Sequence, residues 1–203
     1  MSAAILVLAT RNPGKIRELK SLLSAWTLDL RSLDDIGFAG VLEEPGPGYT
    51  DNALAKAMAV CTATDLPSLA DDSGIEVDAL RGWPGPHSAR WMGDEATDED
   101  RLLGLIAEVE RRTPDDRRAR YVCVAALARP EGEPVTAHGE CLGSITSPPR
   151  GTNGFGYDPC FLSLDLGVTF AEAPDEEKAR VSHRARAIAR LGAAGVLEPP
   201  AFD

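Results

Sequence analysis

The sequence contains no apolar run that approaches the roughly 18 residues needed to span a membrane. The short apolar stretch at residues 4–9 has no basic residue before it and leads into polar sequence, which is not the pattern of a secretory signal. The four cysteines, Cys61, Cys123, Cys141 and Cys160, form no CxxC pair, so neither a zinc site nor a disulfide framework is indicated. We therefore expect a cytoplasmic protein with no membrane partner, and we expect Cys123 to be a buried free thiol.

Positive charge is also scarce. The chain carries 21 Lys and Arg against 32 Asp and Glu, which gives a net charge of −11. General nucleic-acid binders gain affinity by neutralising phosphates, so we expect no nucleic-acid partner. A small phosphorylated ligand remains compatible with this balance, because local lysines and a bound metal can reverse the field inside one cleft.

No internal repeat, low-complexity tract or linker divides the 203 residues, which predicts one domain over residues 1–203. Strands are expected at 4–9, 27–33, 119–128 and 134–145, and helices at 13–25, 50–64, 97–111 and 175–192, the last capped by Asp175. A strand, an acidic turn and a second strand are expected over 66–77, with irregular chain at 43–48, 81–88 and 151–159. Because strands and helices interleave, the predicted class is α/β, or mixed α+β, around one mixed sheet.

The first candidate site is the turn Thr10–Lys15, which joins the first strand to the first helix. Asn12 is a good helix cap, and Pro13 suits the first helical position. Backbone N–H groups and the helix dipole at such a turn face an anion, and Lys15 adds a point charge after Gly14. The turn does not match the GxxxxGK[ST] loop, and an ordinary helix cap with an exposed lysine is the alternative.

The second candidate is the acidic pair Asp71-Asp72. Adjacent acids at the end of an apolar strand are costly unless they are paired or bind a metal, and carboxylates of this kind hold Mg²⁺ together with water and substrate phosphates. Glu44, from the pair Glu43-Glu44, could supply a further oxygen ligand. The alternatives are an Asx-type turn between two strands and a solvated acidic loop.

Two further candidates lie towards the C-terminal end. Within the glycine-rich stretch 151–159, Phe155 and Tyr157 could stack on a base, and Asp158 could accept from ring N–H groups; a glycine-rich hairpin with core aromatics is the alternative. On the last predicted helix, Lys178 and Ser182 are four residues apart and would share a face. A basic, solvated helix face is the alternative there.

These segments occur in an order that resembles the inosine triphosphate pyrophosphatase (Ham1) family. The resemblance covers nearly the whole chain and rests on TRNPGKIREL at 10–19, EEPGPGYTDNALAKA at 43–57, LADDSGIEVDAL at 69–80, GWPGPHSARWMG at 82–93, GTNGFGYDPCF at 151–161 and EEKARVSHRARAI at 176–188. It implies a long mixed sheet with two helical lobes and an active-site cleft between them. It also implies Mg²⁺ as cofactor, a nucleotide as small-molecule substrate, and a homodimer.

The implied reaction converts a nucleoside triphosphate and water into the monophosphate and pyrophosphate, with hypoxanthine and xanthine as preferred bases. Asp72 matches the proton acceptor, with Asp71 as a possible helper, and Lys15 would add charge at the phosphates. Glu44 and Asp72 match the metal ligands. The matching substrate-binding positions are Thr10, Arg11, Asn12, Pro13, Gly14, Lys15, Ser73, Phe155, Gly156, Tyr157, Asp158, Lys178, His183 and Arg184. Donation from His183 and Arg184 to a 6-keto oxygen would disfavour adenine.

The sequence departs from the family pattern at a few positions. Arg11 stands where many members have Gly, Pro45 and Gly48 replace a common Thr pair, and Ala185 replaces Gly. None of these changes removes a predicted catalytic group. Three alternatives stay open: a Maf-like pyrophosphatase with another base preference, a metal-dependent phosphomonoesterase, and a nucleotide-binding protein without enzymatic activity.

Overall fold

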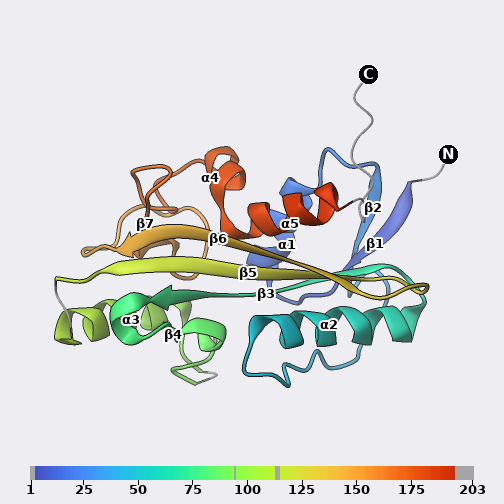
Figure 1. The fold of residues 1–203 in the computed structure, drawn as a ribbon, viewed down its shortest axis with the longest axis horizontal. Coiled ribbons are helices and arrows are strands. Elements are labelled where there is room, and N and C mark those ends of the chain that lie inside the picture. Colours follow the sequence, from blue (N-terminus) through green and yellow to red (C-terminus); the bar gives the residue numbers. More distant parts are fainter. Residues whose placement is uncertain (1–2, 94, 113–114, 195–203) are drawn as a thin grey trace. The chain divides into compact units, whose positions relative to one another are not determined.

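The computed structural model describes residues 3–93, 95–112 and 115–194, and it is a mixed α/β fold (Figure 1). The strands are β1 (Ala4–Leu8), β2 (Leu28–Ser32), β3 (Ser68–Val77), β4 (Trp83–Pro84), β5 (Arg118–Ala128), β6 (Val135–Ile145) and β7 (Phe161–Ser163). They are hydrogen-bonded in the order β2-β1-β3-β5-β6-β7, with β4 paired to β3. Because β1 runs parallel to β2 and β3 whereas β4 and β7 pair antiparallel, the sheet is mixed, as the sequence predicts.

The helices are α1 (Pro13–Leu22), α2 (Tyr49–Thr64), α3 (Asp98–Arg112), α4 (Asp175–Val181) and α5 (His183–Ala193). The chain forms two compact units. The first comprises Met1–Asp72, Cys123–Gly139 and Arg184–Asp203, and the second comprises Ser73–Val122 and Glu140–His183. The single domain over 1–203 and the cleft between lobes stay predictions. In the described part of the chain, no helix is long and apolar enough to cross a membrane.

The first unit buries both faces of its strands. Side chains alternate along β1, so Leu6 and Leu8 belong to one core cluster while Val7 and Ala9 belong to another. The first cluster is completed by α1 and α5, and the second by α2, whose alanines at 53 and 57 allow close approach to the sheet. Cys123 is a fully buried free thiol, as predicted.

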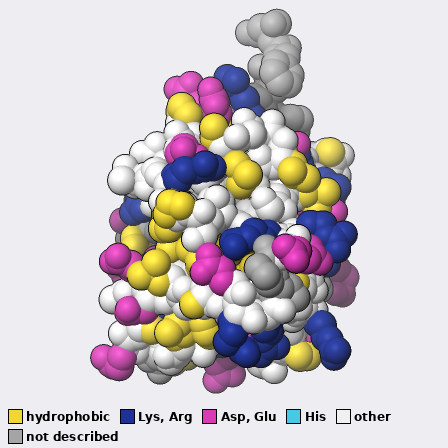
Figure 2. All heavy atoms as spheres, turned by 90° about the vertical axis from the view of Figure 1, so that its left-hand side faces the viewer, with side chains coloured by type: hydrophobic (Ala, Val, Ile, Leu, Met, Phe, Trp, Pro, Cys, Tyr) yellow, Lys and Arg dark blue, Asp and Glu magenta, His cyan; other side chains and the backbone are white. Residues whose placement is uncertain are grey.

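The second unit has one core. Helix α3 contributes Leu102, Leu105, Ile106 and Val109, a spacing that places one apolar face on the sheet. Buried aromatic side chains from β5 and the segment 157–170 complete this core. On the face of the molecule drawn in Figure 2, acidic and basic side chains are interspersed.

Local capping signals in the sequence are confirmed. Asn12 caps α1, where its Oδ1 accepts from the Lys15 backbone N–H at 3.0 Å. At the start of α3, the Thr97 and Asp100 side chains accept from each other's backbone N–H groups at 3.1 and 2.9 Å. Helix α1 ends at Leu22, three residues before the predicted end.

Two predictions about elements are wrong. Residues 68–77 form the continuous strand β3, and no acidic turn interrupts it, because Asp71 and Asp72 find charged partners inside the protein. The predicted helix 175–192 is two helices, since Ser182 has extended backbone (φ −63°, ψ 154°) and its N–H closes the last turn of α4. Asp175 lies in the first turn of α4, and Pro174 occupies the cap position.

Candidate active site

The turn Thr10–Lys15 connects β1 to α1 in the first unit. Thr10 is buried, and its hydroxyl accepts from the Asn12 N–H at 3.2 Å. Together with the Asn12 cap, this bond fixes the turn, and Pro13 and Gly14 occupy the start of the helix. The Lys15 ammonium reaches back towards β3 and lies 3.1 Å from Asp71 Oδ2. The turn is therefore a fixed helix start with a buried lysine contact, rather than a cap with an exposed lysine.

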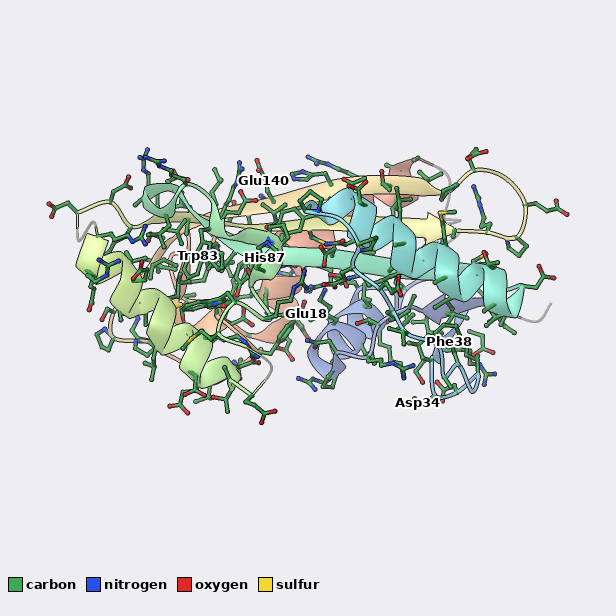
Figure 3. The ribbon with its side chains drawn as sticks, turned by 90° about the horizontal axis from the view of Figure 1, so that it is seen from below. Glu18, Asp34, Phe38, Trp83, His87 and Glu140 are labelled. Carbon is green, nitrogen blue, oxygen red and sulfur yellow. The ribbon has the colours of Figure 1, made fainter. Side chains whose placement is uncertain are left out.

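Arg11 is directed away from this turn, towards the loop that follows β2. Its Nη2 donates to the backbone carbonyls of Phe38 and Gly40, both at 3.0 Å, and its Nη1 lies 3.9 Å from Asp34. Asp34 and Phe38 are labelled in that loop in Figure 3. The residue that departs from the family pattern thus ties the turn to a neighbouring loop.

Asp71 and Asp72 face opposite sides of β3. Because side chains alternate along a strand, Asp71 shares its face with Leu69, whose cluster includes α1 and α5. Asp72 shares its face with Ala70, whose cluster includes α2. The two adjacent acids therefore meet different partners.

Asp71 is fully buried between two basic side chains. Its Oδ2 accepts from Arg184 Nη2 at 2.9 Å and from Arg184 Nε at 3.3 Å, and it faces Lys15. Arg184 also donates to Glu18 through Nη1. Burial by itself would raise the pKa of Asp71, but the charges of Arg184 and Lys15 outweigh it and hold that pKa well below its usual range. Asp71 is therefore ionised at neutral pH.

Asp72 belongs to a second group of polar side chains, which come from α2 and from the acidic loop at 43–48. Lys56 Nζ lies 3.1 Å from Asp72 Oδ1 and 2.8 Å from Glu44 Oε1, so one ammonium bridges the two carboxylates. Asn52 Nδ2 donates to Asp72 Oδ2 at 3.0 Å, and Asn52 Oδ1 accepts from the Gly46 N–H at 2.9 Å. Burial raises the pKa of Asp72 above its usual value, against the lowering effect of Lys56.

The Lys56 ammonium keeps its proton in this setting. Burial lowers its pKa, but the carboxylates of Asp72, Asp71 and Glu44 raise it by more, so the net shift is upward. Among residues 3–93, 95–112 and 115–194, no group of three or more His, Cys, Asp or Glu side chains is arranged to hold a metal. Two carboxylates that already share one cation nevertheless suit Mg²⁺, which is usually held by one or two carboxylates with waters and phosphates.

Lys56, Asn52 and Glu18 are site residues that the sequence reasoning missed. Asn52 and Lys56 are four residues apart on the alanine-rich helix α2, so they share one face. Both are buried. Two polar residues at this spacing among alanines were the available signal. Glu18 lies three residues after Lys15 on α1, which places both on neighbouring positions of that helix.

The second unit holds a separate polar group around Asp158, which is buried. Lys178 Nζ lies 2.5 Å from Asp158 Oδ2, and the same oxygen accepts from the Phe155 N–H at 2.8 Å. The Lys178 ammonium also lies 5.4 Å from the centre of the Phe155 ring and 5.3 Å from that of Phe170. The alternative of a basic, solvated helix face therefore does not hold at Lys178, which is buried on α4.

His183 and Tyr157 are both buried, in different settings. The His183 ring stacks on Tyr121 at 4.5 Å between ring centres, with 7° between the planes. The Tyr157 hydroxyl accepts from Trp91 Nε1 and donates to the Ser88 carbonyl, both at 2.7 Å. The Tyr157 hydroxyl is thus held by two partners within the second unit, and a contact between its ring and a base stays a prediction.

A pocket of about 480 Å³ opens beside the glycine-rich stretch of the second unit. It is lined by the start of α3 and by this stretch: Asp98, Glu99, Leu102, Leu103, Pro149, Gly151, Thr152, Asn153, Gly154, Phe155, Gly156 and Pro159. The Gly156 N–H donates to Asp98 Oδ2 at 3.2 Å, and its φ of 60° suits glycine. Phe155 and Gly156 are the predicted site residues on this pocket, while Ser73 lies half-buried in β3 directly after Asp72.

The structure thus places the predicted site residues in three groups. In the first unit, Lys15, Asp71 and Arg184 meet on one face of β3, while Glu44 and Asp72 meet at Lys56 on the other. The second unit joins Phe155, Asp158 and Lys178. A strand that leads into a helix N-terminus with a lysine in its first turn is suited to bind an anion such as a phosphate, which places the protein among the α/β proteins with a candidate phosphate site.

The comparison with known proteins agrees with this class, and the chain belongs to the Ham1 family, whose sequence model matches residues 6–194. It is 46% identical over 194 residues to a dITP/XTP pyrophosphatase of Syntrophobacter fumaroxidans, covering 94% of this chain and 82% of that relative. It is 47% identical over 186 residues to a dITP/XTP pyrophosphatase of Geobacter sulfurreducens, covering 92% and 94%. The solved structure of the Staphylococcus aureus Ham1 protein is similar with a TM-score of 0.83 and 35% identity, covering 95% of this chain and 98% of that one.

Proposed function

We propose that the chain hydrolyses non-canonical purine nucleoside triphosphates, ITP and dITP or XTP and dXTP, to the monophosphate and pyrophosphate. This reaction would remove deaminated purines from the nucleotide pool before they are incorporated. The observation that carries the proposal is the charged cluster of the first unit, where the lysine of the helix-start turn contacts a buried aspartate. Relatives at 46 and 47% identity are named as dITP/XTP pyrophosphatases.

Four carboxylates and three basic side chains make up this cluster: Glu18, Glu44, Asp71 and Asp72 with Lys15, Lys56 and Arg184. Its net charge is therefore negative before any substrate binds. A triphosphate would be repelled by such a surplus unless a cation accompanied it. This balance supports a requirement for a divalent metal, and we propose Mg²⁺.

Glu44 and Asp72 would hold the Mg²⁺, since their oxygens already converge on the Lys56 ammonium. When bound, the metal would neutralise phosphate charge and polarise the phosphoryl oxygens. The turn Thr10–Lys15 would bind the triphosphate, and Lys15 would add positive charge where the transition state is anionic. Arg11 would take part through its place in the turn, because its side chain is held by the loop after β2. The Lys56 ammonium, protonated and buried, would keep Asp72 and Glu44 in place.

Asp72 would accept a proton from water as the water oxygen bonds to the α-phosphorus. The bond between that phosphorus and the bridging oxygen breaks, and pyrophosphate leaves. A general base works best when its pKa is near the working pH, and the pKa of Asp72 is raised in that direction by burial. Ser73, which follows Asp72 in β3, is proposed as a substrate contact.

The residues of the second unit are proposed to bind the nucleoside. Lys178 is the buried cation of this group and lies beside the Phe155 ring, which is partly exposed at the pocket. We propose that Phe155, Gly156, Tyr157, Asp158, Lys178 and His183, all in the second unit, bind the nucleoside. Arg184, in the first unit, is proposed as a nucleoside contact on the family resemblance alone. Polar groups that hydrogen-bond a 6-keto base are left unpaired by a 6-amino base, which is a large penalty.

Three further proposals concern assembly, location and partners, and of these the homodimer rests on the family resemblance. We propose that the protein works as a homodimer in the cytoplasm and has no nucleic-acid partner, in keeping with its net charge of −11. Light scattering on the purified protein is expected to give twice the 21.6 kDa chain mass. A mass of one chain at micromolar concentration would contradict the dimer.

The decisive experiment measures pyrophosphate release from ITP, XTP, dGTP and ATP, with and without Mg²⁺, for the wild type and Asp72→Asn. We expect Mg²⁺-dependent release from ITP and XTP that collapses in the variant. Strong turnover of ATP or dGTP would support the proposed reaction type but refute the proposed base preference. Orthophosphate as product would indicate a phosphomonoesterase, and tight ITP binding without turnover would indicate a binding protein.

A further inference from the structure

Asp71 lies in the charged cluster, but the proposed reaction assigns it no step. Its Oδ2 alone contacts both Lys15 Nζ, at 3.1 Å, and Arg184, at 2.9 and 3.3 Å. The Lys15 ammonium also donates to the Asp71 backbone carbonyl at 3.3 Å. One oxygen atom therefore holds two cations that come from different helices, α1 and α5.

The Asp71 carboxylate is closed off from solvent. Its side chain is 0% exposed, and its other oxygen, Oδ1, is buried without a hydrogen-bond partner among the residues that the structure describes. Arg184 is equally enclosed at 2% side-chain exposure, whereas Lys15 is 15% exposed. Lys15 is thus the cation that can move towards an incoming phosphate. When Lys15 moves, Arg184 is the cation that remains in contact with Asp71.

We propose that Asp71 is a positioning residue that couples the phosphate-binding lysine to the buried arginine through this shared oxygen. The inference rests on the proposed function, in which Lys15 binds phosphate and Arg184 takes part in nucleoside binding. Two cations that share one anion compete for it, so removal of either one strengthens the hold of Asp71 on the other. Asp71 also differs in role from Asp72, which lies on the opposite face of β3.

The test uses inorganic tripolyphosphate, a probe that carries phosphates and no base. Its dissociation constant is measured by calorimetry for the wild type, Arg184→Met, Asp71→Asn and the double variant. We expect Arg184→Met to weaken binding about five- to tenfold, a normal size for coupling between sites, because Asp71 then neutralises Lys15 alone. In the Asp71→Asn background, the same substitution is expected to change binding less than about twofold.

Asp71→Asn alone is expected to leave tripolyphosphate binding as tight as in the wild type or tighter, since a competitor for Lys15 is lost, while kcat for ITP falls. A purely structural role would weaken binding and turnover together. The matched control is Asp29→Asn, which removes an aspartate–arginine pair (2.6 Å to Arg31) at the surface of the same unit and is expected to change neither. An unchanged affinity in Arg184→Met, or an equal loss in both backgrounds, would overturn the proposal.

If circular dichroism shows that Asp71→Asn is unfolded, Lys15→Met gives the reciprocal test, because Lys15 is partly exposed. Its residual turnover is expected to show a several-fold lower ratio of kcat/KM for ITP over ATP, since Asp71 then holds Arg184 alone. An unchanged ratio would refute the coupling. Coupled tripolyphosphate binding without pyrophosphate release from ITP would refute the proposed function and leave the coupling intact.

Discussion

Replacing Lys56 by Met tests the electrostatics of the cluster most directly. Met keeps most of the apolar stem and removes the ammonium that lies 2.8 Å from Glu44 and 3.1 Å from Asp72. The side chain of Lys56 is only 7% exposed, so water cannot take the place of the lost cation without rearrangement. The two carboxylates are then left facing each other.

The magnitude follows from how far each carboxylate is buried. Breaking a buried ion pair by removing one partner costs about 3–5 kcal/mol. Glu44 is 26% exposed and can turn towards solvent, while Asp72, at 5%, keeps its hydrogen bond from Asn52. We therefore expect the low end, a loss of about 3 kcal/mol in the free energy of unfolding. For a chain of this length, that corresponds to a fall in Tm of about 6–12 °C.

Calorimetric unfolding in metal-free buffer measures this loss, with Lys20→Met, an exposed lysine of α1, as the matched control. The pKa of Asp72 is already raised by burial and rises further without the Lys56 ammonium. The variant therefore takes up a proton as the pH falls, so its deficit is expected to be smaller at pH 5 than at pH 7.5. Added Mg²⁺ is expected to raise the Tm of the variant more than that of the wild type. A loss below about 1 kcal/mol, or a deficit independent of pH, would refute the reasoning.

Four further predictions concern single substitutions. Gly74→Ala places a Cβ 2.0 Å from the Gly85 carbonyl oxygen, so we expect a loss of about 1–3 kcal/mol in urea unfolding, and a neutral result would contradict this packing. Asp71 has a pKa far below its ordinary value of 3.8. The wild type is therefore expected to be more stable than Asp71→Asn by a constant amount above about pH 5, and by less as the pH falls further. Urea unfolding from pH 7 to 3 checks this sign. Tyr157→Phe removes two buried hydrogen bonds and is expected to cost about 1–3 kcal/mol without changing the ITP-to-ATP ratio, whereas a changed ratio would place the hydroxyl on the base. Lys178→Met is expected to raise KM for ITP about tenfold, the cost of one lost charged hydrogen bond, while tripolyphosphate binding stays constant; weaker tripolyphosphate binding would place Lys178 at the phosphates.

The sequence predicted best where the signal is local. The caps of α1 and α3 depend on residues at most three positions apart, and both are present as predicted. The apolar periods of β1 and α3 likewise reflect the face that each element buries. The class of fold follows from the alternation of such elements.

Predictions failed where the deciding partner is distant in sequence. The segment 66–77 was expected to be two strands joined by an acidic turn, yet it is one strand in which Asp71 pairs with Arg184, 113 residues further along the chain. The partner of the Tyr157 hydroxyl is also distant, since it accepts from Trp91, 66 residues earlier. Neither pairing can be detected from the local sequence pattern.

The prediction of one continuous helix over 175–192 failed for a different reason. Helical spacing continues from Lys178 through Ser182, so periodicity alone predicts one helix with both residues on one face. The extended backbone of Ser182 ends α4 and starts α5 at His183. Serine competes with helical hydrogen bonding, which makes it compatible with such a break without requiring one.

Adjacent aspartates in one strand cannot have the same role in this fold. Because side chains alternate along β3, Asp71 contacts Lys15 and Arg184, whereas Asp72 contacts Lys56 and Asn52. The first set of partners lowers the pKa of Asp71 far below the working pH, so Asp71 is a poor proton acceptor and a good anchor for cations. Burial raises the pKa of Asp72, which suits proton acceptance. The idea that both acids activate water together is therefore less consistent with the structure than a division in which Asp72 takes the proton and Asp71 fixes the charges around it.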